Sequence, residues 1–161
     1  MADLRELLDE AGYPGARTLL QSGNVILSSS TIPDVAAIEK AIIARTGVKS
    51  RVVSLDVTEV AKIAAANPLL NDAAIQQRDD LSKMVITFLD GDIVPAEIER
   101  PGDDELAPER LVIHKRAVYQ WCPNGILKSQ LKPSWWRQFG PVATTRNVRT
   151  VNRILTAAAS H

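Results

Sequence analysis

Cysteine and histidine are scarce in this sequence, and their scarcity excludes several kinds of site. The chain of 161 residues contains one cysteine, Cys122, and two histidines, His114 and His161. A lone cysteine cannot form an internal disulfide and is typical of a reducing compartment, so we expect a cytoplasmic protein. So few ligands of this type do not supply the Cys and His set of a structural zinc site, and we expect neither a metal nor a cofactor.

Long apolar runs and glycine motifs are also missing. No apolar run reaches the ~18 residues that a membrane-spanning helix needs. The acidic, amphipathic start of the chain does not fit a signal peptide, so we expect no membrane partner. The eight glycines are scattered and form neither a dinucleotide-binding motif nor a Walker motif. The composition, 45% hydrophobic and 24% charged, is that of a soluble globular protein.

Acidic residues are missing from the last third of the chain. All 19 Asp and Glu residues lie at or before Glu109, whereas nine of the 19 Lys and Arg residues follow it. The net charge of zero therefore hides an acidic first part and a basic last part. This asymmetry favours either self-association or a polyanionic partner, unless folding mixes the two charges.

Apolar spacing and turn residues predict alternating helices and hairpins. Helices are indicated by apolar residues every three to four positions, and strands by short β-branched runs. The predicted helices cover 2–11, 33–46, 56–66, 94–100, part of 129–139 and, after a break at Gly140-Pro141, the C-terminal segment. The predicted strands cover 17–21, 25–29, 49–55, 83–89, 110–115 and 118–122, with a turn at 22–24, a loop with some helix at 71–81 and a loop at 101–104.

This order of elements predicts an α+β fold with mainly antiparallel sheets and helices packed on them. Each half has the pattern of a β-α-β-β-α-β ferredoxin-like unit that lacks one strand, and we expect two interleaved units of this kind. We place the division at residue 70, with a first unit over 1–70 and a second unit, which carries the basic C-terminal helix, over 71–161.

The sharpest chemical feature is the segment 144–155, where a helical period separates an apolar face from an arginine face. Val148, Val151 and Leu155 define the apolar face. One of the two threonines at the start of the segment is the expected N-cap of the helix, because threonine oxygens accept hydrogen bonds from helix-start amides.

The arginine face consists of Arg146, Arg149 and Arg153. Like charges at this spacing repel by roughly 0.2–0.5 kcal/mol per pair, and a cation in the first turn also opposes the helix dipole. A bound anion would offset this cost, because helix-start amides, hydroxyls and guanidinium groups together bind phosphate. The alternative is a solvated basic face, or arginines that pair with carboxylates elsewhere in the fold.

Four groups of residues occur in order along the chain: Met1–Leu8 with Thr18–Ser29; Ala65–Pro68; Tyr119 with Pro123–Gly125 and Ser129; and Thr144–Asn147 with its helix. Together they resemble the bacterial domain-of-unknown-function family 1697. The resemblance implies a two-part α+β protein with interleaved ferredoxin-like units, and it implies no particular activity.

Members of that family usually carry a further strand with a glycine turn ahead of the position of Met1, and often tryptophan at the position of Val148. A missing strand would leave an open sheet edge, or a gap that another chain could fill. A homodimer is therefore one alternative for the partner of this chain. If the glycine turn contributes to a site in the family, that part of the site is absent here.

Two further groups of side chains have both a functional and a structural interpretation. Cys122 and His114 lie on adjacent predicted strands and could form a nucleophile pair, although a buried structural cysteine is the interpretation that we favour. Trp121, Trp135 and Trp136 lie among cations and could stack bases, although core packing is favoured for them.

We predict that the basic C-terminal half binds a phosphate-bearing ligand, either nucleic acid or a nucleotide-like molecule. The candidate anion-binding residues are Thr144, Thr145, Arg146, Asn147, Arg149, Arg153, Lys128 and Ser129. One alternative is an enzyme with an anion pocket between the two units, assisted by Tyr119 or Ser129, for which the sequence identifies no catalytic base. The other is a self-associating structural protein whose arginines pair with its acidic half.

Overall fold

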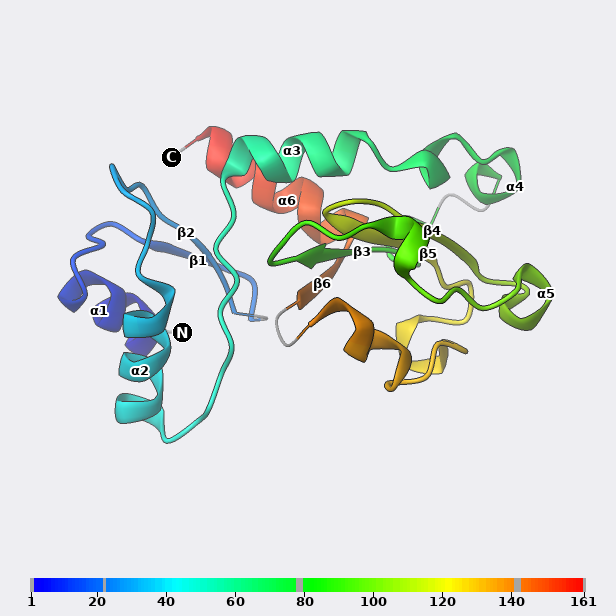
Figure 1. The fold of residues 1–161 in the computed structure, drawn as a ribbon. Helices are drawn as coiled ribbons and strands as arrows, with labels where there is room; N and C mark the ends of the chain where they lie inside the picture. The colour runs from blue at the N-terminus through cyan, green and yellow to red at the C-terminus, as the bar shows by residue number, and fades with distance from the viewer. Residues whose placement is uncertain (1, 22, 78–79, 141–142, 161) are drawn as a thin grey trace. The chain divides into compact units, whose positions relative to one another are not determined.

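The computed structural model describes residues 2–21, 23–77, 80–140 and 143–160. The chain forms two compact units, which we call unit 1 (residues 1–55 and 153–161) and unit 2 (residues 56–152). The chain thus changes unit after Leu55 and again after Asn152. The division into domains 1–70 and 71–161 stays a prediction. Figure 1 shows the order of the elements along the chain.

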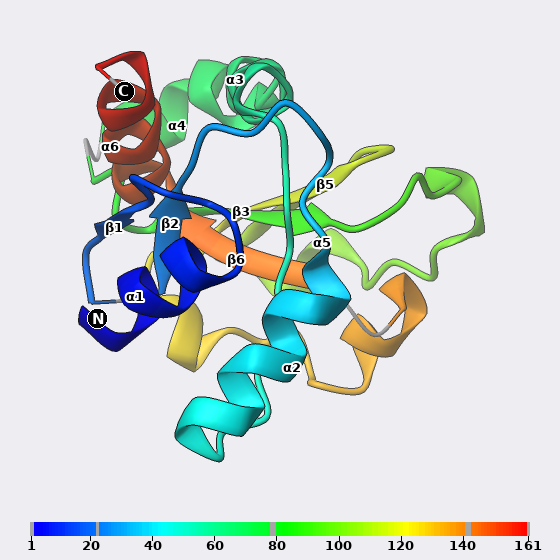
Figure 2. The same ribbon diagram turned by 90° about the vertical axis from the view of Figure 1, so that its left-hand side faces the viewer.

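Unit 1 consists of a short hairpin and two helices. Its elements are α1 (Ala2–Glu10), β1 (Arg17–Leu19), β2 (Asn24–Ile26) and α2 (Val35–Thr46). The strands pair antiparallel, with Thr18 opposite Val25, and α1 contacts both α2 and β1 (Figure 2). The core contains Leu7 and Leu8 of α1 and Ile38 of α2, which confirms the two amphipathic helices predicted for this part of the chain.

Helix α2 is bounded by the turn residues that flank its apolar run. The side chain of Asp34 accepts a hydrogen bond of 3.0 Å from the amide of Ala37, which caps the first turn. Gly47 ends the helix at a φ of 69°, a left-handed conformation that glycine adopts without steric strain. Its amide donates to the carbonyl of Ile43, as expected for a glycine C-cap.

The strand predicted over 49–55 is wrong. This segment has no regular secondary structure, and the amide of Val52 donates to Oε1 of Glu39 at 2.8 Å instead of to a neighbouring strand. A strand needs a partner, and in the described part of the chain the sheet of unit 1 contains only β1 and β2. Val52 packs against the core of unit 1, so the apolar pattern reflects burial rather than sheet pairing.

Unit 2 contains a four-stranded sheet with helices and short 3₁₀ turns packed on it. Its helices are α3 (Val57–Ala65), α4 (Ala73–Gln76), α5 (Asp103–Leu106) and α6 (Val148–Ala159), the last of which continues into unit 1. Its strands are β3 (Met84–Leu89), β4 (Arg110–Ile113), β5 (Ala117–Trp121) and β6 (Ala143–Asn147). The 3₁₀ turns are η1 (Pro68–Asn71), η2 (Pro95–Glu97), η3 (Ile126–Lys128) and η4 (Trp135–Phe139).

The sheet of unit 2 has the strand order β4-β5-β3-β6, and every neighbouring pair is antiparallel. Together with the hairpin of unit 1 and the helices, it confirms the predicted α+β class with antiparallel sheets. The finer description as ferredoxin-like units stays a prediction, because short helical segments rather than two full helices connect β3 to β4 and β5 to β6.

One face of this sheet is covered by the segments that connect its strands. Leu111 and Val118 on this face form an apolar cluster with Leu89, with Leu106 of α5 and with residues of the loop after β5. Trp135 and Trp136 of η4 pack against the same cluster. Their two rings meet edge-on, with a centroid separation of 4.9 Å. This packing agrees with the core interpretation of these two tryptophans.

The opposite face of the sheet carries helix α3 (Figure 1). Tyr119 of β5 lies on this face and is fully buried, and its hydroxyl donates a 2.8 Å hydrogen bond to the carbonyl of Ile63 in α3. Nδ2 of Asn67, just after α3, lies 3.1 Å from the sulfur of Met84 on the same face. These contacts fasten the end of α3 to the middle of the sheet.

The C-terminal helix α6 starts later than the sequence predicts. The expectation that Thr144 or Thr145 caps this helix is wrong, because both belong to the edge strand β6, which pairs with the buried strand β3. Asn147 caps the helix instead: its Oδ1 accepts a 2.8 Å hydrogen bond from the amide of Thr150. Threonine is β-branched and suits a strand, so pairing with β3 outweighs its preference for an N-cap.

The remaining predictions of local structure are confirmed at the hairpin of β1 and β2, at α3, at the partly helical segment 71–81, and at β3, β4 and β5, and two groups need correction. The predicted loop at 101–104 runs into helix α5, and the helices predicted at 94–100 and 129–139 contain only the 3₁₀ turns η2 and η4. Pro95 occupies the start of η2, where proline is compatible only with a first turn. Ser22 of the predicted turn and Pro141 of the predicted break before the last helix lie outside the described residues.

Candidate functional site

The four residues predicted to form the start of an anion site lie on both faces of strand β6. Arg146 pairs with Ile86 of β3, and Thr145 pairs with Thr87. Since side chains alternate along a strand, Thr144 and Arg146 share the face of Ile86, whereas Thr145 and Asn147 belong to the other face. The structure therefore does not bring all four side chains around one point.

Arg146 is half-buried and anchored to its own strand. Its Nη1 donates to Oγ1 of Thr144 at 2.7 Å and to the carbonyl oxygen of Thr145 at 2.9 Å. Burial lowers the pKa of the guanidinium from its ordinary value. These contacts fix the side chain, so Arg146 is a less exposed anion receptor than the helical pattern predicted.

Arg149 and Arg153 are exposed on α6. Nη2 of Arg149 lies 3.9 Å from Oδ1 of Asp80, and the two side chains are 62% and 39% exposed. An ion pair of this length and exposure contributes little to stability. Arg149 can therefore exchange Asp80 for another anion at little cost.

Lys128 and Ser129 follow one another but have different environments. Lys128 is exposed at the end of η3, whereas Ser129 is half-buried. Oγ of Ser129 donates to Oε2 of Glu109 at 2.9 Å and accepts a 3.1 Å hydrogen bond from the amide of Leu131. Ser129 therefore belongs to an internal network, and only Lys128 presents its charge to solvent.

The centre of that network is Glu109, a residue absent from the candidates found in the sequence. Glu109 is only 4% exposed. Its Oε2 also accepts a 2.6 Å hydrogen bond from Nε2 of Gln120, and its Oε1 accepts one of 2.7 Å from the amide of Gln130. Glutamate is normally exposed, so the sequence offers no signal for this burial beyond the position of Glu109 directly before an alternating strand. The network ties the loop after β5 to the start of β4.

Cys122 lies beside this network and is not paired with a histidine. It is 1% exposed, and burial first, then the charge of Glu109, raises the pKa of its thiol to about 12. His114 follows β4 and lies near the opposite end of β5, where its ring is tilted against that of Tyr119 at a centroid separation of 6.3 Å. The Cys122–His114 nucleophile pair is therefore wrong, and Cys122 is a buried structural thiol.

A small pocket opens on the α3 face of the unit 2 sheet. It has a volume of about 120 Å³ and is lined by Leu69, Leu70, Ile75, Gln76, Asp80, Leu81, Met84 and Trp121. Leu69, Ile75, Met84 and Trp121 are buried, so most of the lining is apolar and fixed by the core. Its apolar lining with few polar groups resembles that of a small-molecule site, although its volume is below the roughly 300–1,000 Å³ usual for such sites.

Asp80 is the charged group of this pocket. Its Oδ1 accepts hydrogen bonds from Oγ of Ser82 at 2.5 Å and from the amide of Ser82 at 3.0 Å. These hydrogen bonds, with the nearby charges of Lys83 and Arg149, lower the pKa of Asp80 below its ordinary value, so the carboxylate is ionised at neutral pH. Asp80 thus lines the pocket and forms a weak ion pair with Arg149, which lies outside the lining.

The described residues define a protein with an apolar pocket and an exposed ion pair at its rim, on an α+β scaffold. Within the described ranges, no three His, Cys, Asp or Glu side chains gather closely enough to hold a metal ion. In the same part of the chain, no helix combines the length and the apolar character that crossing a bilayer requires.

The chain belongs to the family described as "Protein of unknown function (DUF1697)", which it matches over residues 1–119. This match confirms the resemblance drawn from the sequence. No curated protein and no solved structure matches the chain. Seven of the eight pocket-lining residues lie within the matched range, whereas Trp121 and Arg149 lie after it.

Proposed function

We propose that unit 2 binds a small organic anion, with the apolar part of the ligand in the pocket lined by Met84 and Trp121 and its anionic group on Arg149. This proposal keeps the anion-binding role predicted for the C-terminal half and includes phosphate-bearing ligands. The observation that carries it is the combination of an apolar pocket with a guanidinium group held at its rim by a weak ion pair.

The pocket limits the size of the apolar part. An engineered cavity of about 150 Å³ lined by Leu, Ile and Phe binds benzene, so a pocket of about 120 Å³ fits a single ring or a branched aliphatic group. Gln76 and Asp80 are its polar lining residues, and the other lining side chains offer dispersion contacts. Burial of apolar ligand surface would supply affinity at about 25 cal/mol per Å².

Arg149 supplies the contact for the charged part. A guanidinium group binds carboxylate or phosphate through two parallel hydrogen bonds, which are stronger than a single exposed contact of 3.9 Å. None of Arg149, Arg153 and Lys128 lines the pocket itself, but within the described residues Arg149 is the one of the three that forms an ion pair with a lining residue, Asp80. The proposal therefore assigns the charge of a small ligand to Arg149 alone.

The test is calorimetric titration with ligands that share one apolar group. We expect 4-methylpentanoate and 3-methylbutyl phosphate to bind, and neutral 3-methylbutanol to bind at least about tenfold more weakly, a difference of 1.4 kcal/mol. Arg149→Ala should remove this preference for anions. Arg137→Ala, which removes an exposed arginine of η4, is the matched control and should retain it. If no anion in the series binds, the proposal fails.

Nucleic acid binding is a separate outcome of the same experiment. A strand that follows α6 would contact Arg149 and Arg153 together, and its affinity would fall steeply with salt because several counterions are released. A small ligand should instead be insensitive to Arg153→Ala and show a shallow dependence on salt. The proposal also includes a reducing cytoplasmic compartment, which the single buried thiol of Cys122 supports.

A further inference from the structure

We propose that the ligand of this pocket is a free α-amino acid with an apolar side chain, such as leucine, isoleucine or methionine. This inference rests on the proposed binding of an organic anion by unit 2 and specifies the chemical class of that anion. In this arrangement the α-carboxylate binds Arg149, the α-ammonium group binds Asp80, and the side chain enters the pocket.

The atoms of Asp80 favour a ligand that donates hydrogen bonds. Within the described part of the chain, Oδ1 of Asp80 accepts both hydrogen bonds from Ser82 and faces Arg149 at 3.9 Å. Oδ2 of the same pocket-lining residue is the acceptor that remains for a ligand. An ammonium group supplies three donors together with the opposite charge.

The size and lining of the pocket specify the side chain. A volume of about 120 Å³ is smaller than the cavity of about 150 Å³ that binds benzene, which favours an isobutyl, sec-butyl or thioether chain over an indole or purine ring. Met84 and Trp121 present a polarizable thioether and an aromatic ring to such a chain, and both are fixed in the core. Asp80 thus selects for the ammonium group, whereas the buried lining residues limit the size of the ligand side chain.

The decisive experiment compares ligands of one shape on the wild-type protein by calorimetry. L-leucine carries both charges, 4-methylpentanoate lacks the ammonium group, and L-leucinamide lacks the carboxylate. We expect L-leucine to bind at least about tenfold more tightly than either of the other two, because each removal leaves one charge of the rim without a partner. This comparison needs no variant and so does not depend on how substitutions affect folding.

Variants then assign each contact. In Asp80→Asn the advantage of L-leucine over 4-methylpentanoate should disappear, and in Arg149→Ala its advantage over L-leucinamide should disappear. If Asp80 had only a structural role, Asp80→Asn would lower the affinity for all three ligands equally. Asp90→Asn, which alters an exposed carboxylate in the turn after β3, is the matched control and should keep both preferences.

The outcomes separate this inference from the proposed function. If 4-methylpentanoate or 3-methylbutyl phosphate binds through Arg149 as tightly as L-leucine, the amino-acid inference is overturned and anion binding stands. If L-leucine and every anion of the series fail to bind, both are overturned. Binding of L-leucine that depends on Asp80 and on Arg149 supports both.

Discussion

Oε1 of Glu109 accepts a 2.7 Å hydrogen bond from the backbone amide of Gln130, so a buried carboxylate holds the loop that follows β5. The other oxygen of Glu109 accepts from Gln120 and Ser129. Three donors converge on this side chain. Nε2 of Gln120 also donates to Oγ of Ser129 at 2.7 Å, so removal of the Glu109 side chain takes the acceptor mainly from the amide of Gln130 and the hydroxyl of Ser129. The stability of unit 2 should therefore depend strongly on this single glutamate.

Glu109→Ala should lower the free energy of unfolding by about 3 kcal/mol or more, because each donor left unsatisfied costs about 1–3 kcal/mol. Glu109→Gln keeps one acceptor and should cause an intermediate loss. Urea unfolding followed by circular dichroism measures both. Glu97→Ala, on the exposed turn η2, is the control and should change stability by less than about 0.5 kcal/mol. A loss of that size for Glu109→Ala would show that the network is dispensable.

The elements that the sequence predicted well are those whose local signals agree with their packing. Strand β3 is buried along its whole length and is apolar at every position except Thr87, and α2 is flanked in sequence by its cap residues Asp34 and Gly47. The strand predicted over 49–55 is absent because its valines indicate burial only. A strand also needs a neighbouring strand, which the local sequence does not specify. The predicted start of α6 was wrong because Thr144 and Thr145 pair with β3, a tertiary contact that the local sequence does not show.

The candidate site was predictable only in part. The arginines of the last helix were visible as a charge pattern, and Arg149 does reach the rim of a pocket. Its partner Asp80 lies far away in sequence, within a segment with weak periodicity, and nothing local connects the two residues. Glu109 and Gln120 were missed because their hydrogen bonds join a strand to a distant loop. Long-range contacts of this kind leave no periodic trace.

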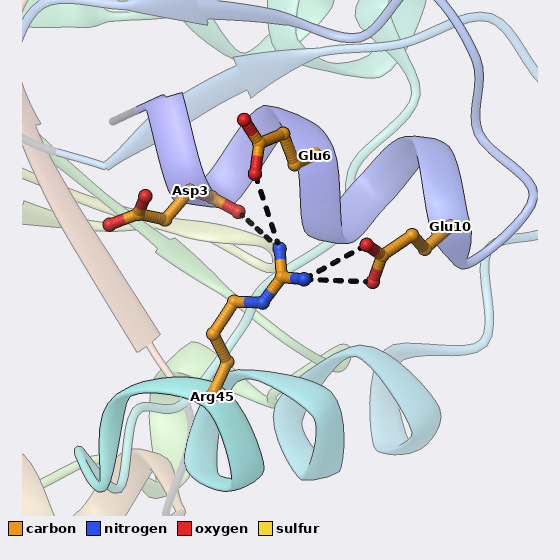
Figure 3. A network of polar contacts seen from close by, with 4 residues as sticks. All are labelled: Asp3, Glu6, Glu10 and Arg45. Atoms are coloured by element: carbon orange, nitrogen blue, oxygen red, sulfur yellow. Dashed lines mark hydrogen bonds and ion pairs between the residues drawn. The ribbon is translucent and has the colours of Figure 1, made fainter.

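Arg45 joins the two helices of unit 1, and its loss should have a small, salt-dependent effect (Figure 3). Its Nη2 donates to both oxygens of Glu10 at 2.9 and 3.0 Å, and its Nη1 donates to the carbonyl oxygen of Asp3 at 3.3 Å. Because the Glu10 side chain is 67% exposed, Arg45→Ala should cost only about 0.5–1 kcal/mol.

Urea unfolding at low and high salt measures this contribution, which should shrink as salt screens the charges. Arg45→Lys should restore less than half of it, because an ammonium group cannot form the same two-pronged contact. Arg5→Ala removes an exposed arginine of α1 and serves as the control. A loss that is independent of salt would indicate that the aliphatic part of Arg45, rather than its charge, stabilises the helices.

Cys122 should be inert in the folded protein. With the pKa of its thiol raised to about 12 by burial and by Glu109, almost no thiolate exists at pH 8, and the sulfur is 1% exposed. A thiol reagent such as dithionitrobenzoate should therefore react with it only after unfolding. Rapid modification of the native protein would contradict this burial.

The raised pKa of Cys122 also sets a direction for the dependence of stability on pH. The folded state holds the thiol proton more tightly, so this contribution is complete below the ordinary pKa of 9.0 and is lost as pH rises towards about 12. The slope in this window is at most about 1.4 kcal/mol per pH unit. Cys122→Ala should flatten the alkaline part of a stability profile, although Tyr119, whose pKa burial also raises, will retain a share of it.

The hydroxyl groups of Thr87 and Thr145 lie 2.8 Å apart across β3 and β6, and only Thr87 is buried, at 2% exposure. Thr145→Val removes the partner of a buried hydroxyl and should cost about 1–3 kcal/mol. Thr87→Val leaves the exposed hydroxyl of Thr145 to water and should cost less than about 1 kcal/mol, and the double variant should resemble Thr87→Val. A double-mutant cycle in urea measures the coupling, which should be at least about 0.5 kcal/mol. Equal losses for the two single variants, with no coupling, would show that the two threonines act through their strand propensity and not through their hydrogen bond.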